Sequence, residues 1–336
     1  MPLRVCLAIG LVFCFATASH AQRDGVGYRQ VTLSDPNDSG RRIAVAMFYP
    51  ATRTADAKPF AMPFFAGLEF YEDAPPKQDP RPLILFSHGR GSNPLAYAWI
   101  GQLLAANGYV VAAPFHFRAN TYDARIAYLA NNLWQRPRDL SMIIDVLGRH
   151  PTFGALIDLT RIGVAGHSQG GFTALWLAGA EVDAERFQAF QRRWKSNAMV
   201  PAHLREALSV DPSPALGMRD RRIRAAFAMA PGIIQAFGMT RSSLSRVAIP
   251  THITVGARDT QTPPEDNAAF AAAHIPGATL VVLPGDVDHE IFVNECSQEG
   301  RDEFPEACID APGIDRKTIH ARIEDDLLRF FGAALR

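Results

Sequence analysis

Ser168 lies in the pentapeptide Gly-His-Ser-Gln-Gly at 166–170, which fits the pattern G-x-S-x-G. The residues at 162–165 form a short apolar run typical of a buried strand, and an Ala/Leu/Trp-rich stretch typical of a helix follows. A serine on so sharp a turn has strained backbone angles, and glycines at its flanks avoid collisions with the neighbouring elements. The pattern predicts a nucleophilic hydroxyl, with a glycine-rich turn that carries an incidental serine as the alternative.

A serine hydroxyl attacks a carbonyl carbon only if a base takes its proton and an acid orients that base. After an elbow of this kind the acid and the histidine follow the serine in chain order. Asp259 comes shortly after the apolar run 251–255, and His289 follows the apolar run 280–283. We therefore expect Ser168 as nucleophile, His289 as base and Asp259 as the acid.

Two further carboxylates precede His289 in the chain and are alternatives for the acid. Asp286 and Asp288 are so close to His289 in sequence that either one would rarely reach the far ring nitrogen with good geometry. Asp259 is therefore favoured. The remaining histidines lie in turn motifs or lack a loop after a strand in the right order: His88, His116, His150, His167, His203, His252, His274 and His320.

A tetrahedral intermediate needs two backbone N–H donors. One is expected from the residue after the nucleophile, Gln169. The other is expected from the loop His-Gly-Arg-Gly at 88–91, where the N–H of Arg90 is our choice. The glycines of that loop also permit a tight turn between a strand and a helix, and the two interpretations are compatible.

The elements that would position these residues alternate along the chain. A first pair of strands is separated by turn residues at 35–40, which favours an antiparallel hairpin at the edge of the sheet. Strands and helices then alternate, which predicts a mostly parallel sheet covered on both faces. The eight strands are expected near 30–33, 43–49, 82–87, 108–113, 162–165, 225–229, 251–255 and 280–283, and the principal helices near 96–107, 137–149 and 316–335.

Two segments interrupt this alternation. Residues 181–222 are an insertion with expected helices at 183–195 and 201–208, and it is either a cap over the strand ends or a surface decoration. Residues 51–80 are expected to be a long surface loop. Its aromatic side chains either pack onto the body or line a pocket, and packing is favoured.

The N-terminus has the features of a secretory signal peptide. A short basic start, an apolar run at 5–16 and the small residues before position 22 predict cleavage after Ala21. The run is too short to span a bilayer, so we expect no stable membrane anchor. Residues 22–336 are then a single secreted or periplasmic domain. In an oxidising compartment its two remaining cysteines, Cys296 and Cys308, are expected to form a disulfide.

Composition excludes several classes of function. The hydrophobic fraction of 48% is ample for a core of this size. Lys+Arg and Asp+Glu both number 34, and a formal net charge of zero gives no indication of nucleic acid or an anionic membrane as a partner. Ligand spacing for a metal is not evident, and the chemistry above requires no cofactor.

With these residues in order, the chain resembles the α/β-hydrolase superfamily over nearly its whole mature length. Phe-Ser-His-Gly at 86–89 together with the elbow is similar to the branch of platelet-activating-factor acetylhydrolases and dienelactone-hydrolase-like proteins, including exported bacterial members. Dienelactone hydrolases proper use a cysteine where this chain has Ser168. The eukaryotic acetylhydrolases place their acid after the strand that corresponds to 225–229, and here Ala-Pro-Gly follows at 230–232.

The resemblance implies an α/β-hydrolase fold and a serine esterase that acts on a small-molecule ester. A lipase or phospholipid acyl hydrolase and a dienelactone-type lactone hydrolase are alternatives within the same chemistry. From a different class, a non-catalytic α/β-hydrolase that only binds a ligand is the remaining alternative, and the intact set of expected site residues argues against it.

Overall fold

The computed structural model describes residues 23–54, 57–127, 133–198, 202, 205 and 217–336. The expected signal peptide and most of the expected helix at 201–208 lie outside these residues. The strands are β1 (Arg23–Asp35), β2 (Asp38–Arg53), β3 (Tyr71–Glu72), β4 (Arg81–Ser87), β5 (Val110–Pro114), β6 (Ile157–His167), β7 (Ile223–Met229), β8 (Thr251–Gly256) and β9 (Thr279–Leu283). The helices are α1 (Ala98–Ala106), α2 (Gln135–Leu147), α3 (Gln169–Ala178), α4 (Ala184–Ser196), α6 (Arg241–Leu244), α7 (Ala268–His274), α8 (Gln298–Glu303), α9 (Pro305–Cys308) and α10 (Arg316–Ala334), with 3-10 turns η1 (Pro94–Tyr97), η3 (Gly154–Leu156) and η4 (His289–Phe292).

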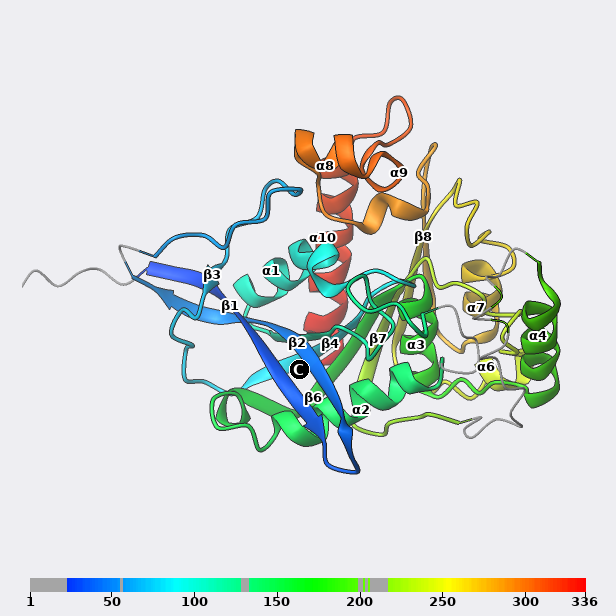
Figure 1. Cartoon of the computed structure of the whole chain (residues 1–336), viewed down its shortest axis with the longest axis horizontal. Helices are drawn as coiled ribbons and strands as arrows, with labels where there is room; N and C mark the ends of the chain where they lie inside the picture. Colours follow the sequence, from blue (N-terminus) through cyan, green and yellow to red (C-terminus); the bar gives the residue numbers. More distant parts are fainter. Residues whose placement is uncertain (1–22, 55–56, 128–132, 199–201, 203–204, 206–216) are drawn as a thin grey trace, which may run out of the picture.

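These strands form one twisted sheet in the order β3-β1-β2-β5-β4-β6-β7-β8-β9. The antiparallel hairpin β1–β2, with the two-residue β3 outside β1, forms one end of the sheet (Figure 1), and β5, β4 and β6 to β9 are parallel to one another. The predicted mostly parallel α/β fold is confirmed. The described sheet has nine strands rather than eight because the two residues of β3, inside the expected loop, pair with β1.

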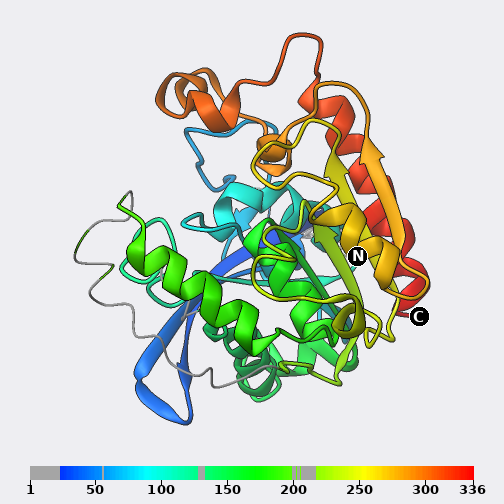
Figure 2. The same cartoon turned by 90° about the vertical axis from the view of Figure 1, so that its right-hand side faces the viewer.

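Helices cover both faces of the sheet. α1 and α10 contact each other behind the sheet in Figure 1, and the ring of Phe331 in α10 packs against Gly163 of β6. α2 and α3 contact each other, and α7 packs against β8 and β9. Figure 2 shows α4, the first helix of the 181–222 insertion, on the opposite side of the molecule from α10. The central parallel strands β4, β5, β7 and β8 are thus largely buried on both faces, as their apolar sequences require, whereas the edge strand β9 is only partly buried.

The aromatic residues of the long loop pack onto the body. The ring of Phe70 is 1% exposed and lies 5.2 Å from that of Phe48 in β2, and Phe60 lies 4.8 Å from Tyr28 in β1. The packing alternative for the 51–80 loop is therefore the correct one for these side chains.

Cys296 and Cys308 form the expected disulfide, which joins the segment after η4 to α9. The same segment is tied to the long loop, because Ser297 N–H donates to Phe64 O at 3.0 Å and Ala66 N–H donates to Glu295 O at 2.9 Å. Two loops far apart in sequence are thus held together. In the part of the chain that the structure describes, every helix is too short or too polar to cross a bilayer.

Candidate active site

Ser168 occupies the turn between β6 and α3 with φ 56° and ψ −119°. This is a left-handed backbone conformation that costs an ordinary residue about 1–3 kcal/mol. The flanking glycines are required by space as well: a Cβ on Gly170 would lie 1.8 Å from Ser87 O, and one on Gly166 would lie 2.4 Å from Gly170 O. The steric argument for the elbow holds in the structure.

His289 begins η4 in the loop after β9, and Asp259 follows the end of β8. His289 Nδ1 lies 2.7 Å from Asp259 Oδ2, and the side chains of both residues are almost completely buried. Asp259 also accepts a hydrogen bond from the backbone N–H of Thr262 at 2.7 Å and one from its hydroxyl at 2.8 Å. Three donors therefore fix this carboxylate and its bond to the imidazole.

The alternative acids have other partners. Asp288 caps η4, its side chain accepting from the N–H of Glu290 at 3.1 Å. Asp286 lies on the surface, 3.6 Å from the guanidinium of Arg258. Of the three carboxylates considered, the structure brings Asp259 to the imidazole of His289.

A cleft of about 380 Å³ opens above the elbow. Ser168 and His289 both line it, and so do the two expected backbone donors, Arg90 and Gln169. The wall of the cleft also includes Gly89, Ser92, Tyr97, His167, Gly232, Ile233, Gln261, Thr262 and Glu290. A larger cavity of about 460 Å³ lies beside the β1–β2 hairpin, and its described lining includes none of the expected catalytic residues.

The loop after β4 approaches the elbow closely. A Cβ on Gly89 would lie 3.6 Å from Ser168 Cβ and 3.1 Å from the hydroxyl of Tyr97. The carbonyl of Gly89 is 2.7 Å from Nδ1 of His88. A carbonyl only accepts, so Nδ1 of His88 carries the proton.

His167, which the sequence placed only in a turn motif, supports the loop of His289. Its Nε2 lies 3.0 Å from His289 O, and its Nδ1 lies 2.9 Å from the hydroxyl of Tyr97. The carbonyl requires a proton on Nε2, so Nδ1 accepts from Tyr97. Burial, and then the neighbouring His289, hold the pKa of His167 well below its usual value. His167 is therefore a neutral link between η1, the elbow and η4.

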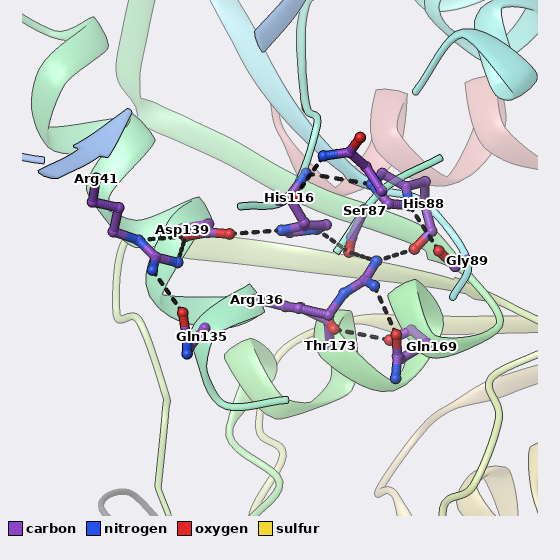
Figure 3. A network of polar contacts seen from close by, with 11 residues as sticks. Arg41, Ser87, His88, Gly89, His116, Gln135, Arg136, Asp139, Gln169 and Thr173 are labelled. Carbon is purple, nitrogen blue, oxygen red and sulfur yellow. Dashed lines mark hydrogen bonds and ion pairs between the residues drawn. The ribbon is translucent and has the colours of Figure 1, made fainter. Parts of the chain in front are cut away.

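The structure contains a second serine–histidine–aspartate chain that the sequence did not indicate (Figure 3). Ser87 Oγ lies 2.8 Å from His116 Nε2, and His116 Nδ1 lies 2.9 Å from Asp139 Oδ2. Ser87 ends β4, His116 follows β5 and Asp139 lies in α2. The neighbouring strands β4 and β5 therefore bring the pair together, and the helix supplies the acid.

All three residues of this chain are at most 1% exposed, and none lines the cleft. Arg41 pairs with Asp139, and Arg136 Nη2 lies 3.3 Å from Ser87 Oγ. Burial holds the pKa of His116 well below its usual value, and Arg136 and Arg41 add to this effect. Burial raises the pKa of Asp139 to about 6, with Arg41 opposing. Ser87, His116 and Asp139, with the two arginines, thus form a closed polar network inside the fold.

Comparison with known proteins bears on the fold. A family model described as platelet-activating factor acetylhydrolase, isoform II, matches residues 69–136, which include the loop with Arg90. No curated protein matches the chain. Among solved structures, a ferulic acid esterase from Streptomyces cinnamoneus is similar with a TM-score of 0.64 and 20% identity, over 95% of this chain and 92% of the esterase. The similarity to the esterase structure and the sheet order show an α/β-hydrolase-like fold, and residues 69–136 are similar to the platelet-activating factor acetylhydrolase family.

Proposed function

We propose that the protein is a serine carboxylester hydrolase with Ser168 as nucleophile, His289 as general base and Asp259 as the residue that orients the base. The observation that carries this proposal is the 2.7 Å contact between His289 Nδ1 and Asp259 Oδ2, on a cleft that Ser168 also lines. Because Nδ1 is engaged by the carboxylate, Nε2 is the nitrogen that takes the serine proton.

The reaction follows from these positions. Ser168 Oγ attacks the ester carbonyl carbon while His289 accepts its proton. The negative oxygen of the tetrahedral intermediate is held by the backbone N–H groups of Arg90 and Gln169. His289 then gives the proton to the departing alcohol, which leaves an acyl group on Ser168. Water, activated by His289, releases the acid and restores the enzyme.

The size of the cleft supports a small-molecule ester as substrate. Its volume of about 380 Å³ is near the lower end of the roughly 300–1,000 Å³ of small-molecule sites. The aromatic residues of the long loop that would widen an apolar cleft, such as Phe60 and Phe70, pack against β1 and β2 instead. Short acyl groups should therefore be the best substrates.

The test is hydrolysis of p-nitrophenyl acetate by purified wild-type protein and by Ser168→Ala. We expect the variant to fold normally, to lose hydrolysis and to lose labelling by a fluorophosphonate probe, because both reactions need the serine oxygen. Hydrolysis by a folded Ser168→Ala protein at the wild-type rate would refute the proposal. A wild-type protein that neither hydrolyses esters nor reacts with the probe would support a non-catalytic binding protein.

A phospholipid acyl hydrolase is the second candidate, and the similarity to the acetylhydrolase family over residues 69–136 favours it over other lipases. A series of p-nitrophenyl esters of increasing acyl length separates the two, together with a short-acyl phospholipid and a lactone. A small-ester hydrolase should lose kcat/KM steadily as the acyl chain lengthens. Preference for the phospholipid or for the lactone would replace the small ester as the substrate class.

We also propose that the protein is exported. The disulfide between Cys296 and Cys308 supports this, because such bonds persist in oxidising compartments. N-terminal sequencing of the protein from its native host should begin at residue 22. A mature chain that retains residues 1–21 would contradict cleavage.

A further inference from the structure

The guanidinium of Arg136, in the first turn of α2, touches both segments that carry the proposed oxyanion donors (Figure 3). Its Nη1 donates to the side-chain oxygen of Gln169 at 2.7 Å, and its Nη2 donates to the backbone carbonyl of His88. Nη2 also lies 3.3 Å from Ser87 Oγ. One planar group therefore joins the end of β4 to the start of α3.

The contact with His88 bears on the orientation of the donor in Arg90. His88 Nδ1–H donates to Gly89 O at 2.7 Å. Because a trans peptide is planar, the N–H of Arg90 points opposite to the carbonyl of Gly89. Holding that carbonyl thus holds the N–H that we assign to the oxyanion hole. Arg136 fixes His88 in turn, through the carbonyl of the same residue.

The contact with Gln169 bears on the second donor. Gln169 is the first residue of α3, and its carbonyl accepts from the hydroxyl of Thr173 at 2.8 Å. Arg136 binds its side-chain oxygen. The backbone of Gln169, which carries the second N–H, is therefore restrained in two ways: Arg136 holds its side chain, and Thr173 holds its carbonyl.

Stability alone does not account for a guanidinium in this place. Arg136 is 3% exposed, and within the described residues its guanidinium donates to three neutral groups, on Gln169, Ser87 and His88. Burial lowers the pKa of Arg136 to about 9, with Asp139 opposing. A buried cation without a directly paired carboxylate is costly, and apolar residues of similar volume often stabilise a fold as well or better.

We propose that Arg136 is a positioning residue that holds the N–H groups of Arg90 and Gln169 in the geometry that the oxyanion requires. This rests on the proposed serine esterase function. The guanidinium does not line the cleft, so it acts through His88 and Gln169 and not by contact with the substrate. Its planar fork suits two acceptors on different segments, which a lysine ammonium does not match.

The chain offers a matched control in Arg41, a second buried arginine of the same polar network. Arg41 pairs with Asp139 and donates to Gln135 at 2.6 Å, on the side of Asp139 away from the elbow. Replacing it disturbs the network and the stability of the fold, but leaves the contacts of Arg136 with His88 and Gln169 in place.

The experiment compares Arg136→Met, Arg136→Lys and Arg41→Met in steady-state hydrolysis of p-nitrophenyl acetate, well below the lowest Tm of the set. Loss of one oxyanion donor lowers kcat by roughly 10²–10³-fold. We expect Arg136→Met to lose about 10²-fold in kcat with KM within about threefold, and Arg136→Lys to lose about tenfold. Arg41→Met should lose Tm but stay within about threefold in kcat.

A boronic acid that adds to Ser168 as a tetrahedral anion supplies a second readout. Its affinity should fall in Arg136→Met by about the same factor as kcat/KM, because it uses the same two donors. If Arg136→Met does not fold, Gln169→Met serves in its place. That variant removes the acceptor of Arg136 and keeps the backbone N–H, and we expect about a tenfold loss in kcat.

Two results would overturn the proposal: a kcat loss in Arg136→Met no larger than in Arg41→Met, or full kcat in Arg136→Lys. Ser168→Ala is measured beside these variants and keeps the two hypotheses apart. If Ser168→Ala is inactive while Arg136→Met keeps full kcat, the positioning role fails and the esterase stands. If Ser168→Ala keeps its activity, the proposed function itself fails.

Discussion

Two sets of serine, histidine and aspartate lie near neighbouring strands of this sheet: Ser87, His116 and Asp139 are enclosed in the fold, whereas Ser168 and His289, with Asp259 behind His289, lie on a cleft. In the closed chain Ser87 bonds His116 and His116 bonds Asp139, at 2.8 and 2.9 Å. In the open set His289 contacts Asp259 at 2.7 Å, and Ser168 lines the same cleft as His289.

The surroundings of each serine explain the difference. Ser87 ends β4 in regular register with Gly166, and its hydroxyl is enclosed by His116 and Arg136. Ser168 lies on a strained turn and lines a cleft together with Arg90 and Gln169, the residues proposed to donate to the oxyanion. Hydrogen bonding of the right polarity is therefore not enough for catalysis, which also needs room for a carbonyl carbon and donors for its oxygen.

The largest expected effect comes from removing each serine hydroxyl in turn. Ser168→Ala should lower kcat for p-nitrophenyl acetate by roughly a millionfold, the size of loss seen when a nucleophile is removed from a triad. Ser87→Ala should stay within about tenfold of wild type, because no substrate reaches it. A fluorophosphonate probe followed by peptide mapping should label position 168 alone. Labelling of Ser87, or a larger loss in Ser87→Ala than in Ser168→Ala, would reverse the comparison.

Replacing Asp259 and Asp139 by asparagine, one at a time, tests which carboxylate serves catalysis and which serves stability. Asp259→Asn should lower kcat about 10⁴-fold with little change in Tm, because the amide favours the wrong tautomer of His289. Asp139→Asn should instead destabilise the fold by about 3–5 kcal/mol, because it leaves Arg41 buried without its counter-charge. Urea unfolding and steady-state kinetics on both variants check this. If the two variants exchange these effects, the closed chain is the reactive one.

Lowering the pH should lower the free energy of unfolding, because three buried histidines in and near the closed network resist protonation in the native protein. The pKa values of His88, His116 and His167 are held well below 6.5, so below that pH the unfolded chain binds protons that the native protein does not. Stability is then full above pH 6.5 and falls as pH drops, by about 1.4 kcal/mol per pH unit for each histidine. Asp139 acts in the opposite direction, since its raised pKa makes the native protein take up a proton first.

Between pH 7.5 and 5.5 these four groups should together lower the free energy of unfolding by roughly 3 kcal/mol, measured with urea at constant ionic strength. Burial also lowers the pKa of His320 to about 4, which should add roughly 1.4 kcal/mol to the loss. In His116→Gln the loss should shrink by about 1.4 kcal/mol, one histidine's share. Equal unfolding free energies at the two pH values would show that these histidines titrate normally in the native protein.

The smallest expected effect concerns the hydroxyl of Thr262, which donates to Asp259 at 2.8 Å in the open set. Asp139 in the closed chain has the charged Arg41 in the corresponding role. Thr262→Val should lower kcat by about tenfold, because a donor to the carboxylate is lost. Thr262→Ser keeps the hydroxyl and should stay near wild type. Equal kcat in the two variants would mean that the backbone N–H of Thr262 orients Asp259 by itself.

Sequence patterns predicted the parts of this molecule that depend on local order. The strand–turn–helix around Ser168, the hairpin and the alternating elements each follow from apolar runs and glycines within about 20 residues. The contact between His289 and Asp259 was inferred from order along the chain, because parallel strands bring their carboxyl ends to one edge of the sheet.

The polar network could not be predicted in the same way. Arg136 and Asp139 lie in the first turns of α2, where charges usually face solvent, and nothing local shows that both are buried. His116 meets Ser87 only because β5 lies beside β4 in the sheet, which a single sequence does not specify. Strand β3 was not predicted because two residues are too few to show the alternation of apolar and polar side chains that marks a strand.

The left-handed backbone at residue 168 has a consequence for how this protein would change under selection. Glycine adopts that conformation freely, whereas serine loses stability there in every folded molecule, whether substrate is present or not. A population selected for thermal endurance alone would therefore gain by replacing Ser168 with glycine. A serine at a position that disfavours it lowers the stability of the fold, and the proposed role of Ser168 as nucleophile gives a reason for that loss.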